Sequence, residues 1–263
     1  MESVFDLKSA KALLEWHAEL GISEAISERP INRFESKVEA DLGPKTSELK
    51  DNPVNIILDN PTDEAVMVSA NAKNLSELKA AIENFPHCDL KYGARNAVFS
   101  AGSPSAKIMI IGEAPGREED FQGEPFVGRA GQLLDRMLFA IGLSREASDA
   151  EKSVYITNVM PWRPPENRDP TQDEIDMMLP FLQRHIELVE PKVIVAMGNV
   201  SCQSLLGRRG ITKLRGVWVE AFGFPVLPML HPAYLLRNPV AKREAWSDLL
   251  SFNRISSRGR VDT

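Results

Sequence analysis

The chain has 263 residues, of which 43% are hydrophobic, and its formal net charge is −6 at pH 7. This length and composition fit one substantial globular domain with an extension, and no apolar run approaches the roughly 20 residues that a membrane helix needs. Two cysteines exclude a disulfide framework and the acidic N-terminal residues argue against a secretory signal, so we expect a cytoplasmic protein without a membrane segment.

Charge is unevenly distributed along the chain. Residues 1–80 carry nine basic and 15 acidic side chains, whereas residues 200–263 carry ten basic and four acidic ones. Because affinity for phosphate follows the local charge rather than the total, the C-terminal quarter is suited to face DNA or RNA. A solvated basic tail is the alternative, and charge alone does not distinguish the two.

Residues 1–75 are predicted to form an N-terminal extension of helix and linker. Apolar residues recur at helical spacing in residues 3–29, and Pro30 ends that pattern. Residues 40–72 combine several prolines with many polar side chains, which predicts a poorly ordered linker. The acidic character of the extension favours packing or protein contact over DNA contact.

Residues 76–263 are predicted to form the main domain, in which strands and helices alternate. A helix is expected at its start, over residues 75–84, with Asn74 or Ser76 near its cap. Further strands are expected at 107–112, 154–159, 193–197, 217–222 and 225–230, and further helices at 131–141, 171–189, 200–206 and 241–250. This order predicts a three-layer α/β/α fold around a central, mainly parallel four-stranded sheet.

The most distinctive loop follows the first strand of this domain. An apolar run at residues 108–111 leads directly into Gly-Glu-Ala-Pro-Gly at residues 112–116. Small residues let the backbone approach a ligand closely, and ligands of open α/β folds bind at the carboxyl ends of strands. A phosphate-binding loop is the weaker interpretation, because this loop carries carboxylates and no lysine.

Polar and aromatic side chains also follow the later strands. Asn158 ends the second strand, Gly198 and Asn199 follow the third, and His231 follows the last. Loops after parallel strands share one edge of a sheet, so we expect these side chains to converge with those of the first loop. An acid, an amide, an aromatic ring and a histidine at one rim are suited to hold a planar substrate that forms hydrogen bonds.

Three motifs together resemble the uracil-DNA glycosylase superfamily, and most closely its family 4. They read GEAPGREEDFQGEPFVGRAGQLL from residue 112, YITNVMPWRPPENRDPT from residue 155 and HPAYLLRNP from residue 231. The resemblance covers residues 99–250 and implies hydrolysis of the N-glycosidic bond of deoxyuridine in DNA. Such an enzyme flips the base into a pocket, releases free uracil and leaves an abasic site. No lysine of these motifs is placed as a Schiff-base nucleophile, so strand cleavage is not expected.

The resemblance implies roles for single residues. Phe126 matches the ring that stacks on uracil, Asn158 the amide that reads its edge, and His231 the donor to uracil O2. Glu119 and Asn167 match polar residues that matter in the family, and Glu119 is suited to stabilise a cationic sugar, orient water or fill the space of a thymine methyl. The predicted catalytic residues are His231, Glu119, Asn167 and Glu113, and the predicted uracil-binding residues are Gly112, Glu113, Phe126, Asn158 and His231.

DNA contact is expected from the segment after His231. It matches the loop that wedges into DNA, where an apolar tip fills the gap left by the flipped base and a cation reaches a phosphate. The predicted DNA-binding residues are Tyr234, Leu235, Leu236, Arg237 and Arg168. The expected partner is uracil-containing DNA, and the expected state is a monomer.

The chain departs from family 4 at the cysteines that commonly hold a [4Fe–4S] cluster there. The four corresponding positions are Phe85, Cys88, Trp162 and Met178. Such a cluster needs four ligands, so we predict that this protein has no cofactor and that bulky side chains fill the space. A DNA-crosslinking branch carries a histidine near residues 163–168, and its absence here argues against covalent trapping.

Two other interpretations compete with the enzyme. One is a module of the same superfamily that binds uracil or abasic DNA without catalysis. The other is a nucleotide-binding α/β enzyme that uses residues 112–116 as a phosphate loop.

Overall fold

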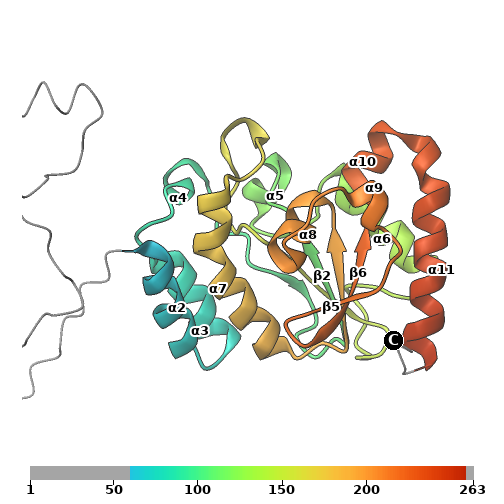
Figure 1. Ribbon diagram of the computed structural model, residues 1–263, viewed down its shortest axis with the longest axis horizontal. Helices are drawn as coiled ribbons and strands as arrows, with labels where there is room; N and C mark the ends of the chain where they lie inside the picture. Colours follow the sequence, from blue (N-terminus) through green and yellow to red (C-terminus); the bar gives the residue numbers. More distant parts are fainter. Residues whose placement is uncertain (1–59, 259–263) are drawn as a thin grey trace, which may run out of the picture. The chain divides into compact units, whose positions relative to one another are not determined.

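The computed structural model describes residues 60–258, and the helix predicted for residues 3–29 lies outside the described residues (Figure 1). Its centre is a six-stranded sheet in the order β1-β3-β2-β4-β6-β5. The strands are β1 (Ala101–Gly102), β2 (Ile108–Gly112), β3 (Val154–Asn158), β4 (Val193–Met197), β5 (Val219–Ala221) and β6 (Phe224–Met229).

The sheet has six strands and not the predicted four, and it is mixed. Strands β3, β2, β4 and β6 run parallel, as expected, but β1 pairs antiparallel with β3 and β5 pairs antiparallel with β6. The predicted strand at residues 217–222 is therefore an edge strand of a hairpin with β6. The two-residue strand β1 is too short for a periodic signal, so the sequence did not show it.

The parallel strands are buried on both faces. Every residue of β2, β3 and β4 is buried, which is why β2 and β4 read as apolar runs, whereas β3 ends in the buried polar residues Thr157 and Asn158. Alternate residues of β2 enter different hydrophobic clusters: Met109 and Ile111 belong to one, Ile108 and Ile110 to the other. The sheet therefore separates two cores, as the predicted three-layer fold requires.

Helices cover both faces of the sheet. The first core receives side chains of α3 (Leu75–Asn84) and α7 (Gln172–Val189), while most buried side chains of α6 (Arg129–Phe139) enter the second. The other helices are α4 (Leu90–Gly93), α5 (Arg117–Gln122), α8 (Asn199–Leu206), α9 (Ile211–Leu214), α10 (Pro232–Arg237) and α11 (Lys242–Arg258), with 3-10 turns η1 (Pro165–Asn167) and η2 (Pro239–Ala241). Within residues 60–258, no helix has the length and apolar character to cross a membrane.

One helix lies inside the predicted linker at residues 40–72. Helix α2 (Pro61–Asn71) begins at Asn60, whose side chain accepts a hydrogen bond from the Thr62 amide, and packs against α7. Only Ala65 and Ser69 of α2 are buried, so the segment carries almost no apolar periodicity to reveal it. The predicted cap of α3 is confirmed, since Asn74 accepts from the Glu77 amide at 2.9 Å.

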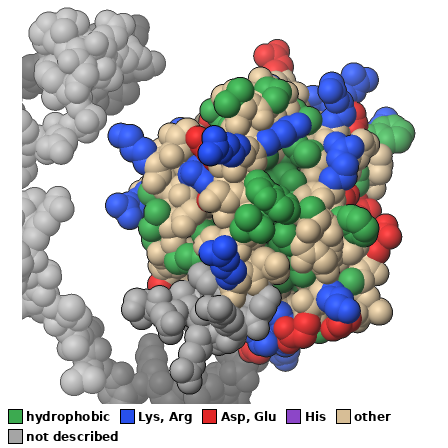
Figure 2. Space-filling view, turned by 90° about the vertical axis from the view of Figure 1, so that its right-hand side faces the viewer, with side chains coloured by type: hydrophobic (Ala, Val, Ile, Leu, Met, Phe, Trp, Pro, Cys, Tyr) green, Lys and Arg blue, Asp and Glu red, His purple; other side chains and the backbone are tan. Residues whose placement is uncertain are grey.

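The carboxyl ends of the parallel strands point toward one edge of the molecule. Helix α10 follows β6 at that edge, near α5 and α9 (Figure 1). The segment predicted as a DNA-wedging loop is thus a short helix. The neighbouring face, which is turned toward the viewer in Figure 2, shows hydrophobic side chains near its centre, with Lys and Arg around them and Asp and Glu toward its edges.

Candidate active site

The site is built around the adjoining ends of β2 and β3. Gly112 and Asn158 are partners in the parallel register, and the Val159 amide donates to the Gly112 carbonyl at 3.0 Å. One residue further, the Met160 amide donates to the Glu113 carbonyl at 3.0 Å. The ladder of the sheet therefore continues into both loops and holds their first residues side by side.

Gly112 leaves the space that the other site residues border. A Cβ atom there would lie 2.4 Å from Asn158 Oδ1 and 2.6 Å from Cε2 and Cζ of Phe126. Asn158 as a residue is only 7% exposed, and its amide, whose atoms are not completely enclosed, forms no hydrogen bond within the described residues. Since buried amides are normally paired, this amide is available to a ligand.

Phe126 and His231 form one wall of the site. Their rings stack with centroids 5.4 Å apart and an interplanar angle of 30°. Phe126 is 5% exposed and has a φ of 55°, a left-handed conformation that costs a non-glycine residue free energy. Aromatic rings at this position, beside a small residue and an amide, suit a flat ligand.

The hydrogen bond that His231 accepts decides its tautomer. As N-cap of α10 its Nδ1 accepts from the Ala233 amide at 3.2 Å. Burial lowers the pKa of its imidazole to about 4, and the Arg237 cation adds to this shift. The ring is therefore neutral near pH 7, its proton lies on Nε2, and Nε2 is the atom that can donate to a ligand.

Glu119 is engaged by backbone amides. Its Oε1 accepts from Val127 N at 3.1 Å and Gly128 N at 2.9 Å, and its Oε2 accepts from Gly116 N at 3.1 Å. The carboxylate thus ties α5 to the loop that carries Phe126. It also occupies the amides that a phosphate-binding loop would offer, which argues against that interpretation.

Glu113 is the carboxylate with a perturbed proton affinity. Burial raises the pKa of its side chain to about 7, Asp169 adds to the rise, and Arg209 and Arg237 oppose it. A carboxyl group with this pKa exchanges protons near neutral pH, which is the property of a general base or acid. Arg209, in the segment before α9, is a neighbour that no motif indicated.

Asn167 and Arg168 lie in a constrained rim loop. Glu166 and Asn167 both have left-handed backbones, and Arg163 Nε donates to Asn167 Oδ1 at 2.7 Å. The Arg168 guanidinium is held by both carboxylate oxygens of Glu174, at 2.8 and 2.6 Å. The ion pair with Glu174 therefore holds Arg168 at the rim, and the structure does not place Asn167 against Asn158.

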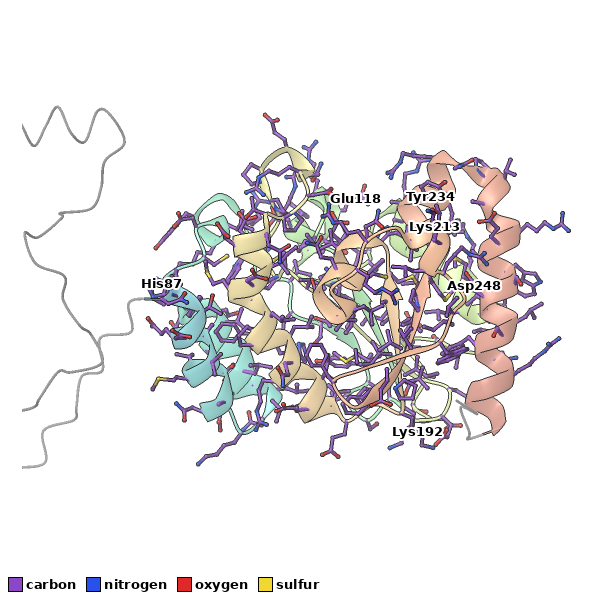
Figure 3. The ribbon with its side chains drawn as sticks, in the orientation of Figure 1. His87, Glu118, Lys192, Lys213, Tyr234 and Asp248 are labelled. Carbon is purple, nitrogen blue, oxygen red and sulfur yellow. The ribbon has the colours of Figure 1, made fainter. Side chains whose placement is uncertain are left out.

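Helix α10 presents only some of its predicted DNA contacts. Leu235 is 1% exposed and packs in the core, so this conformation does not offer it to DNA. Arg237 is exposed, while Tyr234 and Leu236 are partly exposed. Tyr234 and Lys213 lie at the same edge as Glu118, and Lys192 lies at the opposite one (Figure 3).

Arg145 contacts the site without belonging to any motif. It lies between α6 and β3, and its guanidinium donates to the carbonyl oxygens of Pro125 and Phe126, each at 2.9 Å. A single arginine in a connecting loop gives no sequence signal, so its contact with the Phe126 loop becomes visible only in three dimensions.

The four positions that correspond to cluster ligands lie in one apolar core. Phe85, Cys88, Trp162 and Met178 are all buried in the first hydrophobic cluster. Burial raises the pKa of the Cys88 thiol to about 11, which keeps it protonated, and thiolates are the ligands of iron–sulfur clusters. The described part of the chain has no group of three or more His, Cys, Asp or Glu arranged for a metal ion. These residues do not fit an iron–sulfur cluster.

Comparison with known proteins gives a consistent result. Residues 99–250 match the family model described as "Uracil DNA glycosylase superfamily". The chain is 38% identical to the type-4 uracil-DNA glycosylase of Archaeoglobus fulgidus over 71% of its own length and 95% of that protein. It is 42% identical to the type-4 enzyme of Sulfurisphaera tokodaii, over 63% and 77% of the two chains, and 43% identical to that of Thermotoga maritima, over 57% and 77%.

Proposed function

The chain belongs to the uracil DNA glycosylase superfamily, and we propose that it hydrolyses the N-glycosidic bond of deoxyuridine in DNA. It releases uracil and leaves an abasic site, which makes it a DNA-repair glycosylase. The activity named for its relatives supports this proposal, because three type-4 uracil-DNA glycosylases are 38–43% identical to it.

The observation that carries the proposal is the unpaired amide of the largely buried Asn158 beside Gly112. An amide both accepts and donates, so it pairs with N3–H and O4 of uracil at once. Cytosine presents a donor at C4 and an acceptor at N3, which is the reverse pattern. Uracil therefore satisfies the hydrogen bonds of the Asn158 amide, whereas cytosine leaves them unpaired. The free energy lost with cytosine is the basis of discrimination between the two bases.

Stacking supports the entry of a flipped base. A base inside the duplex is inaccessible, so the target nucleotide has to leave the stack. The Phe126 ring, fixed beside Gly112 and His231, offers an aromatic surface that replaces part of the lost base stacking. Gly112 keeps open the space between this ring and Asn158.

His231 is the proposed catalytic donor. As the N1–C1′ bond breaks, its electron pair moves into the uracil ring and negative charge grows on O2. Nε2–H of the neutral imidazole donates to that oxygen and stabilises the leaving anion. Water adds to C1′ of the sugar and gives up a proton.

Glu113 is the carboxylate best suited to receive that proton. Its pKa of about 7 leaves part of it ionised at neutral pH, whereas the Glu119 oxygens are engaged by three backbone amides. We assign Glu119 to positioning of the Phe126 loop. Asn167 stays a predicted site residue at the rim, bound to Arg163.

DNA is the proposed macromolecular partner. Arg237 and the partly exposed Tyr234 and Leu236 support contact through α10, at the edge to which the strands point. The basic balance of residues 200–263 supports attraction to the phosphate backbone.

We also propose that the enzyme works without an iron–sulfur cluster, as a cytoplasmic monomer. The apolar side chains at three of the four ligand positions support the first point. Both cysteines of the chain, Cys88 and Cys202, are buried and free, which supports a reducing compartment.

The deciding experiment measures uracil release from a duplex with one deoxyuridine, followed by alkaline cleavage of the abasic site. The wild type should cleave at uracil, and Asn158→Asp should not, because its carboxylate repels O4. The control Asn84→Asp makes the same change on the exposed side of α3 and should retain activity. Tight binding by the wild type without uracil release would instead identify a non-catalytic binding module.

A further inference from the structure

Two charged side chains hold the loop that presents Phe126. The peptide unit between Phe126 and Val127 is bound at both of its polar atoms: its carbonyl accepts from Arg145 at 2.9 Å, and its N–H donates to Glu119 at 3.1 Å. The preceding carbonyl, of Pro125, accepts from the same guanidinium at 2.9 Å. Bonds to both ends of one peptide unit fix the orientation of its plane.

These hydrogen bonds hold the backbone at a residue with an unfavourable conformation. Phe126 has a φ of 55°, and a bulky residue leaves the left-handed region unless its surroundings hold it there. Charge-assisted hydrogen bonds are about twice as strong as neutral ones, so a guanidinium and a carboxylate are suited to do this. The alternative conformation of Phe126 would carry its ring away from His231 and Gly112.

Arg145 is itself well oriented for the task. Its side chain is 11% exposed, and its Nε donates to Asp135 of α6 at 2.8 Å. The guanidinium thus spans from α6 to the Phe126 loop. Its planar fork matches two neighbouring carbonyls at once, which a lysine ammonium does not do.

Gly131 of helix α6 leaves room for the Phe126 carbonyl group. A Cβ on Gly131 would lie 1.7 Å from the Phe126 carbonyl oxygen, so the helix passes directly against this peptide. The loop is therefore enclosed by α6, by Arg145 and by Glu119. Only one of these, Arg145, lies outside the segment that runs from residue 112 to the end of α6 at residue 139.

We propose that Arg145 is a positioning residue of the glycosylase site. It holds Phe126 in its left-handed conformation, so that the ring stays stacked on His231 at an angle of 30° and receives the flipped uracil. The inference rests on the proposed function for its catalytic consequence, while its structural part concerns the Phe126–His231 stack alone. It predicts that Arg145 affects handling of the base and not affinity for the DNA backbone.

The test compares Arg145→Gln with the wild type in two activity-related measurements. Single-turnover excision of uracil should fall about 10- to 100-fold, because a misplaced ring spoils the geometry of the bound base. Affinity for a duplex with a tetrahydrofuran abasic analogue should stay within about twofold, since phosphate contacts dominate DNA affinity. Lys152→Gln is the matched control: this cation in the same connection is 69% exposed and should change neither value.

A spectroscopic measurement tests the position of the ring without any catalysis. The face of Phe126 lies over His231, so ring current should shift the imidazole proton resonances of His231, which His231→Ala identifies. In Arg145→Gln these resonances should move toward ordinary values. If Arg145→Gln does not fold, Arg145→Lys is measured in the same way. It keeps the positive charge but cannot donate to the Pro125 and Phe126 carbonyls at the same time.

The outcomes separate the two proposals. Failure of the wild type to release uracil would overturn the proposed function, yet the His231 spectrum would still report on Arg145. If Arg145→Gln has the excision rate and the His231 resonances of the wild type, the positioning role is overturned. Parallel loss of excision and of abasic-DNA affinity would also overturn it, because that pattern indicates general disruption.

Discussion

Replacement of Gly112 by alanine should close the base pocket while leaving the fold intact. A Cβ atom would lie 2.4 Å from Asn158 Oδ1 and 2.6 Å from the Phe126 ring, whereas ordinary contacts begin near 3.4 Å. Both neighbours therefore have to move by about 1 Å, and such a displacement costs about 100-fold in rate, or about 2.7 kcal/mol of transition-state stabilisation. Gly112 has no left-handed φ, so the methyl group itself is the perturbation.

The assay is single-turnover release of uracil from a duplex, together with binding of an abasic duplex and thermal unfolding. Overpacking should lower the free energy of unfolding by about 1–3 kcal/mol, which leaves a folded protein to measure. Gly93→Ala is the control, because a Cβ there meets nothing within 4 Å and its φ is not left-handed. Excision by Gly112→Ala within about threefold of the wild type would refute the view that Asn158 and Phe126 border the base across this glycine.

Four further predictions concern the charged groups of the site and the buried Cys88 thiol of the first core. His231→Ala should lower single-turnover excision by about 100-fold or more and keep affinity for abasic DNA; wild-type turnover would remove His231 from the mechanism. The excision rate of the wild type should fall as the pH drops below the Glu113 pKa of about 7. Glu113→Gln should excise uracil slowly, and its rate should not show this fall. The His231 pKa of about 4 places its own titration at lower pH. Folding raises the pKa of Glu113 from 4.5 to about 7, so the folded wild type loses stability as the pH rises through this range. Glu113→Gln has no such group and should become more thermally stable relative to the wild type as the pH rises from 4.5 to about 7. Absence of this relative gain would contradict the burial of Glu113. Purified protein should contain no stoichiometric iron and Cys88→Ser should remain active; a broad brown absorbance lost in that variant would show that a cluster is present.

Much of the fold could be predicted because its parallel strands are mostly apolar. The parallel strands β2, β3, β4 and β6 coincide closely with predicted segments, since burial on both faces leaves no polar alternation in such strands. Helix α2 escaped prediction because it buries only Ala65 and Ser69. The edge strand β1 escaped because two residues have no periodicity. The α10 segment was predicted as a loop, although its six residues form a helix that buries Leu235.

The sequence by itself determined which chemical groups are available to the site. The aromatic ring of Phe126, the amide of Asn158 and the imidazole of His231 follow strands of one parallel sheet, and parallel strands end at one edge. Their convergence was therefore predictable from their places in the chain.

Only the tertiary structure decided the state and task of each group. It engaged Glu119 with backbone amides, raised the pKa of Glu113 by burial, put the His231 proton on Nε2 and brought Arg145 to the carbonyl of Phe126. Proton affinity and hydrogen bonding depend on neighbours in space and on exclusion of water. Arg145 is 19 residues from Phe126 along the chain, and no periodic pattern in the sequence encodes a contact at that separation.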